Sequence, residues 1–239
     1  MMNQQNNLKS WLDQGPFTVS LTSGFFGFFT HVGFVKALFD AGYEPQGYRG
    51  CSAGSIVSAS LASGLSIEQI EQTILAVDRN DFWDPRPGLG LLKGRKFFSL
   101  VQKQTESNFS NLQKPLTISV FDIFSLKTKA INMGAVPEAV WASCAVPMMF
   151  HPVRIQKRFF WDGGILDPLA IHGIDRQERI LIHDITDQTQ WGFKQKISHL
   201  QNAQLIRLND IPKCGPRKLH LGKEIIANAY EKTMSLISL

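Results

Sequence analysis

Short segments rich in β-branched and aromatic residues alternate with helix-like segments along this chain, and that alternation constrains the fold most. The segment FTVSLT (17–22) is typical of a buried strand. In HVGFVKALFD (31–40), Val32, Val35 and Phe39 recur at helical spacing before an Ala-Gly stop. Strands that alternate with helices favour a layered α/β fold with a largely parallel sheet.

The same alternation continues to the C-terminus. Further strands are predicted at 48–51, 116–124, 129–133, 153–155, 158–161, 180–185 and 205–208, and further helices at 52–63, from Ser66 onward, and at 96–108, 137–144 and 221–237. The two strands at 116–124 and 129–133 should pair as an antiparallel hairpin. Since no internal repeat or domain boundary interrupts the pattern, we expect a single domain over 1–239, with residues 1–14 as a flexible or helical extension.

The composition limits the classes of function. A chain of 239 residues with 44% hydrophobic and 19% charged residues is an ordinary globular protein. The formal net charge is +5, and the Lys and Arg residues are scattered rather than clustered. This pattern indicates a basic solvated surface and no nucleic-acid partner, although it is compatible with weak attraction to anionic lipid headgroups.

The cysteines and the N-terminus bear on the compartment. Cys51, Cys144 and Cys214 lie far apart and form neither a disulfide framework nor a metal-type spacing, which favours a reducing environment. The start, MMNQQNNLKSWLDQG, has no apolar stretch of the kind found in signal peptides. No apolar run is long enough to span a bilayer. We therefore expect a cytoplasmic protein that touches membranes peripherally at most.

The segment GCSAG (50–54) places a serine between a short strand and a helix of small residues. Gly50 and Gly54 allow the sharp strand–turn–helix elbow that exposes a nucleophilic serine. Ser52 would then lie at a helix N-terminus, where the helix dipole stabilises a developing alkoxide. The alternative is that Ser52 only caps a helix in a linker rich in small residues.

A serine hydroxyl needs a base before it can attack, and Asp162 is the most prominent candidate. It follows three aromatic residues (159–161) and precedes Gly163 and Gly164, which would turn the chain away and leave the carboxylate at the sheet edge. In parallel α/β sheets that edge is where sites form. The alternative is that Asp162 only stabilises an Asp-Gly turn.

Several blocks together resemble the patatin-like phospholipase family over residues 17 to about 168. The similar blocks are GCSAGS (50–55), WDGG (161–164), ASCAVP (142–147) followed by FHPV (150–153), GLLKG (90–94), and the glycine-containing stretch 23–38 that ends in Lys-Ala-Leu. The resemblance implies a three-layer α/β/α sandwich with a mainly parallel sheet. It also implies a lipid acyl hydrolase whose substrate is a lipid or fatty-acyl ester.

The resemblance assigns roles to two residues. Ser52 would be the nucleophile that forms an acyl-enzyme, and Asp162 would be the general base of a Ser–Asp dyad. No histidine, metal or cofactor is implied. Two alternatives remain: an acyltransferase or another serine hydrolase that uses a histidine triad, and a lipid-binding relative that hydrolyses nothing.

The stretch SGFFGFFTHVGF (23–34) should supply the oxyanion hole. We expect donors among the backbone N–H groups of Ser23, Gly24, Phe25 and Phe26, together with that of Ala53. The stretch departs from the family pattern, because it lacks the first glycine, has one extra residue before its histidine, and has Phe where the family has Arg or Lys. Its phenylalanines either anchor the loop or form an apolar wall for the acyl chain.

Other residues are expected to have structural roles. Asp122 should fix a turn or strand, His31 should make a structural hydrogen bond, and His151 should pack. His172, His183, His199 and His220 show no metal spacing. The leucine loop at 89–92 either contacts lipid or packs, and the last helix should pack on the core.

Overall fold

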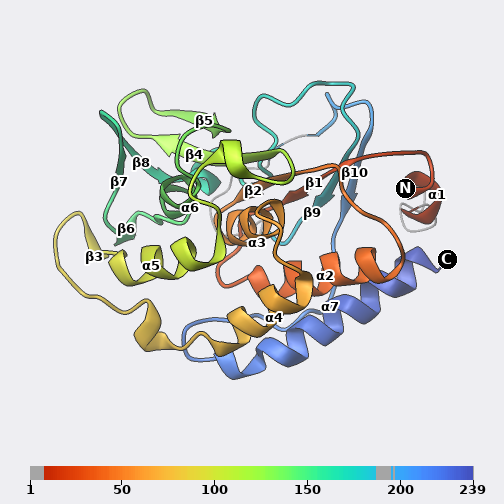
Figure 1. Ribbon diagram of the computed structural model, residues 1–239, viewed down its shortest axis with the longest axis horizontal. Coiled ribbons are helices and arrows are strands. Elements are labelled where there is room, and N and C mark those ends of the chain that lie inside the picture. The colour runs from red at the N-terminus through yellow and green to blue at the C-terminus, as the bar shows by residue number, and fades with distance from the viewer. Residues whose placement is uncertain (1–7, 187–194, 196, 239) are drawn as a thin grey trace.

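The computed structural model describes residues 8–186, 195 and 197–238, and it is built around one large sheet (Figure 1). The strands of this sheet are β1 (Thr18–Leu21), β2 (Gly47–Cys51), β4 (Leu116–Asp122), β5 (Lys127–Ile131), β7 (Val153–Ile155), β8 (Arg158–Asp162), β9 (Ile180–His183) and β10 (Ala203–Ile206). Their order is β10-β9-β1-β2-β4-β8-β7, and β5 pairs with β4. The predicted α/β class is confirmed.

Parallel and antiparallel pairs divide the sheet into two parts. The five strands from β10 to β4 all pair in parallel. The pairs β4–β5, β4–β8 and β7–β8 are antiparallel. The predicted hairpin of β4 and β5 is therefore confirmed, and two further antiparallel pairs extend that end of a mainly parallel sheet.

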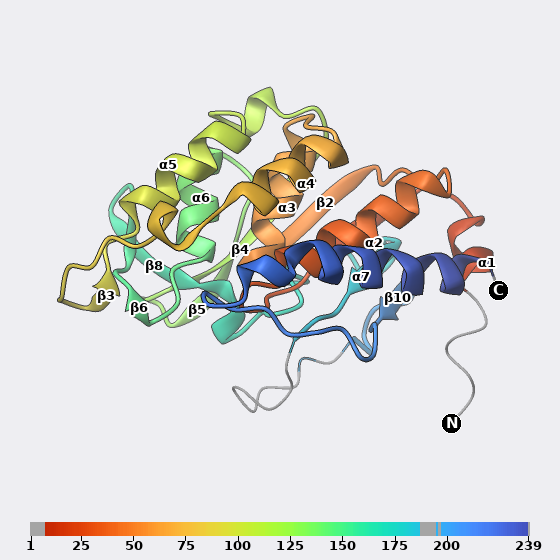
Figure 2. The same ribbon diagram turned by 90° about the horizontal axis from the view of Figure 1, so that it is seen from below.

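The helices form the main core with one face of the sheet. They are α1 (Leu8–Leu12), α2 (Phe28–Asp40), α3 (Ala53–Ala62), α4 (Ile67–Ala76), α5 (Arg95–Gln104), α6 (Val136–Ser143) and α7 (Gly222–Ile237). Buried side chains of α2, α3, α4, α6 and α7 share one apolar cluster with Val19 and Leu21 of β1. In Figures 1 and 2, α2 and α7 run alongside each other, and α4 packs on α2.

The opposite face of the sheet has a smaller core. There Ile180 and Ile182 of β9 pack with Leu169, Ile171 and Leu200, which belong to connecting segments rather than to helices. Polar side chains of the sheet also form hydrogen bonds with these connecting segments. The Ser20 hydroxyl donates to the Leu169 carbonyl, and the buried Arg49 side chain donates to the Ala170 and His172 carbonyls.

Most predicted elements lie within a few residues of their observed bounds. Helix α2 begins at Phe28, three residues before the predicted start, so the phenylalanine stretch runs directly into the helix. The loop at 81–94 contains a strand that was not predicted, β3 (Gly90–Leu92), which pairs with β6 (Met148–Phe150) in a separate small sheet.

Helix α7 packs on the core as predicted. A Cβ atom at Gly33 of α2 would lie 2.3 Å from the Ile226 carbonyl oxygen, so the two helix backbones approach closely. Ile225 and Ile226 are buried in this contact. Among the described residues, no helix has the length and apolar character needed to cross a membrane.

Candidate active site

Ser52 lies on a strained elbow between β2 and α3. Its backbone has φ 52° and ψ −122°, a conformation that non-glycine residues rarely adopt. A Cβ atom at Gly50 would lie 2.6 Å from the Ser55 Cα atom, and one at Gly54 would lie 2.0 Å from the Leu21 carbonyl oxygen. Glycine is therefore required on both sides of the serine, which is the geometry that the sequence motif predicts.

Hydrogen bonds to the Ser143 and Ser55 hydroxyls fix the elbow backbone. The Ser52 N–H donates to the Ser143 hydroxyl at 2.9 Å, and that hydroxyl donates to the Ser119 carbonyl at 2.7 Å. The Ser52 carbonyl accepts from the Ser55 hydroxyl at 2.6 Å. The Ala53 N–H opens the first turn of α3, where N–H groups have no intrahelical acceptor. It can therefore donate to a ligand bound next to the serine.

Asp162 reaches the same place from the other side of β4. Strand β2 pairs with β4 so that Cys51 is opposite Ser119, and β8 pairs with β4 so that Asp162 is opposite Val120. The two strand ends therefore meet at neighbouring positions of one strand. Since β8 is antiparallel to β4, the rule that sites form at the carboxyl edge of parallel strands does not account for the position of Asp162.

The Asp162 carboxylate is buried, and its electrostatic surroundings suit a base. Burial raises its pKa to about 6, while interactions with the Ser52 hydroxyl, the Gly164 N–H and the Cys51 thiol act in the opposite direction. The Gly164 N–H donates to Asp162 Oδ1 at 2.7 Å, and Cys51 Sγ lies 3.8 Å from the same oxygen. A carboxylate with this pKa is ionised at neutral pH and is more basic than an exposed one.

The loop after β1 lies beside this pair. A Cβ atom at Gly164 would lie 3.0 Å from Asp162 Oδ1 and 3.1 Å from the Ser23 side chain, so the start of the loop is next to the carboxylate. The Ser23 N–H, however, donates to the Pro168 carbonyl at 2.8 Å. Of the four predicted loop donors, the N–H groups of Gly24, Phe25 and Phe26 therefore remain as candidates.

The phenylalanines of this loop have different environments. The Phe26 ring contacts the rings of Phe25, Phe28 and Phe82, with centroids 4.8, 5.8 and 5.6 Å away. Phe26 also has a φ of 56°. Phe25 is 46% exposed, whereas Phe29 is buried at the start of α2. Phe26 thus anchors the loop, and Phe25 is the one that presents its side chain outward.

Two buried histidines hold the residue at which this loop begins. His31 Nε2 lies 2.9 Å from the Thr22 carbonyl, and His31 Nδ1 lies 2.9 Å from His183 Nδ1. Because a carbonyl only accepts, His31 carries its proton on Nε2 and accepts from His183 through Nδ1. Burial lowers the pKa of His31 to about 4 and that of His183 well below its usual range, so both rings are neutral. The expected structural role of His31 agrees with these contacts.

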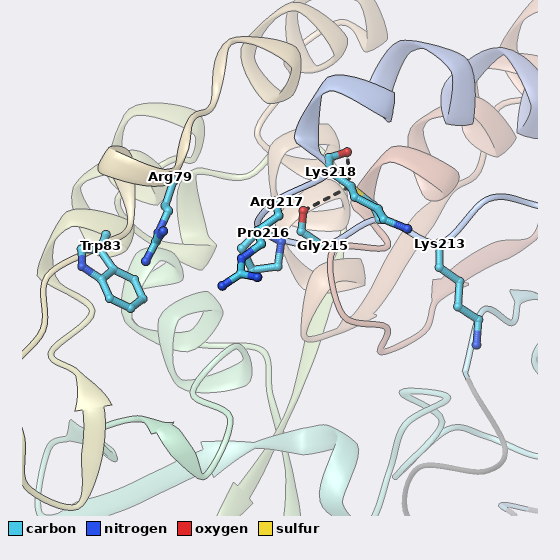
Figure 3. Close-up of a pocket in the computed structure, with 8 residues that line it drawn as sticks. Arg79, Trp83, Lys213, Gly215, Pro216, Arg217 and Lys218 are labelled. Atoms are coloured by element: carbon cyan, nitrogen blue, oxygen red, sulfur yellow. Dashed lines mark hydrogen bonds between the residues drawn. The ribbon is translucent and has the colours of Figure 1, made fainter.

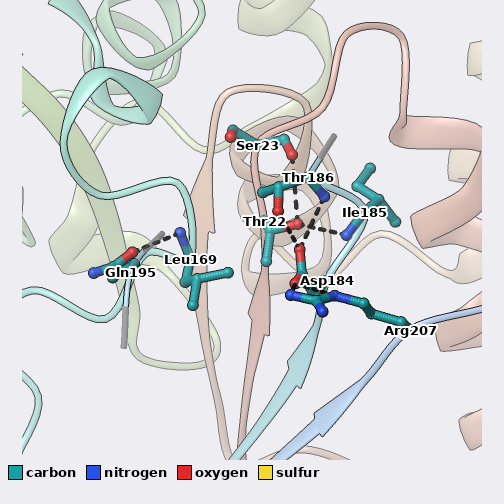
Figure 4. A network of polar contacts seen from close by, with 8 residues as sticks. All are labelled: Thr22, Ser23, Leu169, Asp184, Ile185, Thr186, Gln195 and Arg207. Carbon is teal, nitrogen blue, oxygen red and sulfur yellow. Dashed lines mark hydrogen bonds and ion pairs between the residues drawn. The ribbon is translucent and has the colours of Figure 1, made fainter. Parts of the chain in front are cut away.

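The segment that follows β9 supports the same loop (Figure 4). The Ile185 N–H donates to the Thr22 hydroxyl at 3.0 Å, and Asp184, just before it, pairs with Arg207 at 2.7 Å. Cβ atoms at Gly24 and Gly27 would lie 2.6 and 2.1 Å from Ile185 Cδ1. The loop therefore rests on the Ile185 side chain.

The buried carboxylate of Asp167 was not predicted from the sequence. It accepts hydrogen bonds from the Ser119 hydroxyl at 2.7 Å and from the N–H groups of Ile171 and His172 at 3.0 and 3.1 Å. It thereby joins β4 to the segment that follows Asp162. The signal in the sequence is slight, since Asp-Pro is an ordinary turn pair.

Other candidate residues have local structural contacts. Asp122 accepts from the N–H groups of Phe124 and Ser125 and pairs with Arg158, so it fixes the β4–β5 turn as predicted. His151, predicted only to pack, also hydrogen-bonds the Arg86 carbonyl at 2.7 Å. Within the described part of the chain, no group of three or more His, Cys, Asp or Glu residues is arranged to hold a metal ion.

Solved structures with a similar fold include two bacterial proteins. VipD from Legionella pneumophila aligns with 93% of this chain and 67% of its own, at a TM-score of 0.55 and 14% identity. ExoU, in its heterodimeric complex with SpcU from Pseudomonas aeruginosa, aligns with 93% of this chain and 51% of its own, at a TM-score of 0.52 and 16% identity. At these identities the similarity shows the fold.

Relatives in sequence include a protein of Mycobacterium tuberculosis described as an uncharacterized NTE family protein. It is 29% identical over 162 residues, which are 64% of this chain and 44% of that protein. An uncharacterized protein of Acanthamoeba polyphaga mimivirus is 24% identical over 164 residues, 59% of this chain and 55% of the relative. The chain thus spans less than half the length of the mycobacterial relative.

The family profile described as patatin-like phospholipase matches residues 19–174. This range is well over half of the chain. It contains the Ser52 elbow, Asp162 and the loop between β1 and α2. By this match, the chain belongs to the patatin-like phospholipase family.

Proposed function

We propose that this protein hydrolyses fatty-acyl ester bonds of lipids through Ser52 and Asp162. Membership in the family assigns lipid hydrolysis at the family level. The observation that carries the finer proposal is the strained Ser52 elbow beside a buried carboxylate whose pKa is raised to about 6. Strained backbone and a perturbed carboxylate in one place are typical of a catalytic site.

The proposed reaction has two steps. In the first, Asp162 accepts the Ser52 hydroxyl proton while Ser52 Oγ attacks the ester carbonyl, and the alcohol leaves with that proton as the acyl-enzyme forms. In the second, a water molecule gives a proton to Asp162 and attacks the acyl carbonyl. The fatty acid leaves, and the proton returns to Ser52.

The oxyanion is proposed to bind backbone donors on two elements. The Ala53 N–H lies at the N-terminus of α3, and the Gly24, Phe25 and Phe26 N–H groups lie on the facing loop. One such donor typically contributes about 3–4 kcal/mol to transition-state stabilisation. The hydrogen bonds from His31 and Ile185 to Thr22 would keep this loop in place during the reaction.

The contacts of His31 favour a dyad over a triad that uses this residue. Both of its ring nitrogens have partners, Thr22 and His183. A histidine that acts on Ser52 would need one nitrogen directed to the serine hydroxyl. The carboxylate of Asp162 is already beside that hydroxyl and interacts with it.

We also infer that the small sheet of β3 and β6 contacts the lipid surface. Leu89, Leu91 and Met148 are 70%, 48% and 85% exposed. Gly90 pairs with Met148, so these side chains lie at the edge of one small sheet. Exposed apolar side chains grouped in this way are typical of an interaction surface.

A fluorophosphonate probe, together with a p-nitrophenyl ester assay, tests the proposed nucleophile. The wild type should be labelled on Ser52 and should turn over the ester. Ser52→Ala should lose labelling and lower kcat by about 10³-fold or more, because no other group forms the acyl-enzyme. Ser60→Ala is the matched control, since its hydroxyl bonds the Ile56 carbonyl on the same helix. Retained turnover in folded Ser52→Ala protein would refute the proposal.

A further inference from the structure

A basic pocket lies between the segment after α4 and the segment before α7. It has a volume of about 510 Å³ and is lined by Arg79, Trp83, Lys213, Arg217, Lys218 and the turn at 214–216. Figure 3 shows the Arg217 side chain directed toward the wall that carries Arg79 and Trp83. Two distant parts of the sequence thus form one pocket.

All charged residues that line this pocket are basic. Four of its lining residues are Lys or Arg, and no lining residue is acidic. The carboxylates near Arg79 and Trp83 in the sequence accept backbone N–H groups: Asp78 and Asp81 from Asn80 and Asp78, and Asp84 from residues 94–96. Arg79 and Arg217, on opposite walls, are therefore placed to bind an external anion.

One of these cations is held in a defined position. The Arg79 guanidinium lies 4.2 Å from the centre of the Trp83 ring, in cation–π contact. This contact holds the guanidinium over the ring, and its N–H groups can donate to a ligand in the pocket. Such a group can bind two oxygens of a phosphate at once.

Both walls of the pocket are attached to the phenylalanine stretch of the candidate active site. The Phe82 ring, between Arg79 and Trp83 in the sequence, contacts the Phe26 ring at 5.6 Å. Four residues after Lys218 of the other wall, a Cβ atom at Gly222 would lie 2.5 Å from the Phe29 ring. The pocket is therefore next to the loop that is proposed to bind the oxyanion.

We propose that this pocket binds a phosphate group, and that it holds the headgroup phosphate of the lipid whose ester is cleaved at Ser52. The headgroup part rests on the proposed function. The shared chemistry is a phosphate bound by Arg79 and Arg217, and free phosphate is the other source to be distinguished. A headgroup held there would direct an attached acyl ester toward the Phe25–Phe26 loop.

Binding is tested without turnover, in the Ser52→Ala protein. The probes are inorganic phosphate, read as a shift in the unfolding temperature, and vesicles with or without phosphatidic acid in phosphatidylcholine. Arg79→Gln/Arg217→Gln should lower vesicle affinity about tenfold, and Arg217→Gln alone should lower it less. Lys127→Gln/Lys129→Gln removes the same charge from exposed positions of β5 and should keep the affinity.

The outcomes of the binding experiment distinguish the two sources of phosphate, the lipid headgroup and free phosphate. Stabilisation by inorganic phosphate that is lost in the Arg79/Arg217 variant indicates a site that also takes free phosphate. Vesicle binding that depends on phosphatidic acid and on these two arginines, without stabilisation by inorganic phosphate, indicates the lipid headgroup. Equal losses of vesicle affinity in the arginine and lysine variants would show that only net charge matters, and would overturn the proposal. Unchanged affinity and unchanged stabilisation by phosphate in the arginine variant would overturn it too.

Turnover by the wild type and by variants that keep Ser52 gives an independent measurement. The ratio of kcat/KM for phosphatidic acid to kcat/KM for a neutral p-nitrophenyl ester should fall about tenfold in Arg79→Gln/Arg217→Gln. It should not change in Lys127→Gln/Lys129→Gln. An unchanged ratio in the arginine variant would overturn the headgroup assignment. If the wild type cleaves neither ester, the proposed function fails, and the binding experiment still decides whether the pocket takes phosphate.

Discussion

The serine elbow and the phenylalanine loop form two sides of one candidate site, but they are held in different ways. At the elbow, Gly50 and Gly54 contact backbone atoms, the Ser55 Cα atom and the Leu21 carbonyl. In the loop, Gly24 and Gly27 mainly contact the Ile185 side chain. Backbone atoms cannot move aside, whereas the end of an isoleucine can. The elbow therefore tolerates little change in sequence, and the loop tolerates more.

This difference accounts for how well each side matches the family pattern. The sequence around Ser52 keeps every glycine of the nucleophile block. The loop lacks one glycine and has an extra residue, yet it still begins beside Asp162. Among the described residues, the Gly24, Phe25 and Phe26 N–H groups have no backbone acceptor like that of Ser23. Its position depends on contacts from Ile185, His31 and Phe82, which lie outside the glycine pattern.

The largest expected effect is that of Asp162→Asn, which removes the base but keeps the shape. We expect kcat to fall by about 10²–10⁴-fold, the usual range for a lost general base. In the wild type, kcat/KM should rise through pH 6 and level off above it, because Asp162 acts as a base only when ionised. Full activity in the variant would show that Asp162 is structural.

The same variant has a predicted effect on stability. Burial raises the pKa of Asp162 from 3.8 in the unfolded chain to about 6, so the folded state binds more protons between about pH 4 and 6. Folding stability from this group therefore falls as pH rises through that window. Asp162→Asn should remove this fall and unfold at the same or a higher temperature above pH 6. Thermal unfolding at several pH values measures it.

The next largest effect contrasts Gly54→Ala with Gly24→Ala. The new Cβ atom at Gly54 would lie 2.0 Å from the Leu21 carbonyl, so helix α3 must move from β1, at a cost of about 3 kcal/mol in the free energy of unfolding. At Gly24 it would meet the end of the Ile185 side chain, which can change rotamer, and we expect a cost of about 1 kcal/mol. Urea unfolding of both variants compares them. Similar costs would contradict the contrast between elbow and loop.

The sequence predicted the elbow because its constraint is local. Gly50, Ser52 and Gly54 act within one turn, and the strand and helix beside them have clear periodic patterns. Asp162 could be identified as a residue, but the antiparallel course of β8 could not, since strand direction depends on pairing across the sheet. The loop supports could not be predicted either, because His31 meets His183, and Thr22 meets Ile185, only after β9 pairs with β1.

A double-mutant cycle tests whether the loop acts through its backbone donors. Gly24→Val should lower kcat about tenfold, since a displaced loop weakens the oxyanion contacts. In Gly24→Val/Ile185→Ala, the space next to the valine is restored, and kcat should recover most of this loss. Purely additive losses would mean that Ile185 does not transmit the change. Wild-type kcat in Gly24→Val would mean that the loop is not part of the oxyanion hole.

The smallest expected effect distinguishes two phenylalanines within the loop. Phe25 is 46% exposed, while Phe26 contacts three other rings, so replacing each by alanine should have a different effect. Each buried methylene contributes about 0.8 kcal/mol, and an acyl chain that loses part of its contact with Phe25 loses a fraction of this. Phe25→Ala should therefore raise KM for an octanoyl ester about threefold and leave KM for the acetyl ester nearly unchanged. Phe26→Ala should instead lower the unfolding temperature and reduce kcat for both esters, because it loosens the anchor of the donors. If Phe25→Ala raises both KM values equally, the acyl chain does not lie along this side of the loop, and Phe25 only covers the surface beside Phe26.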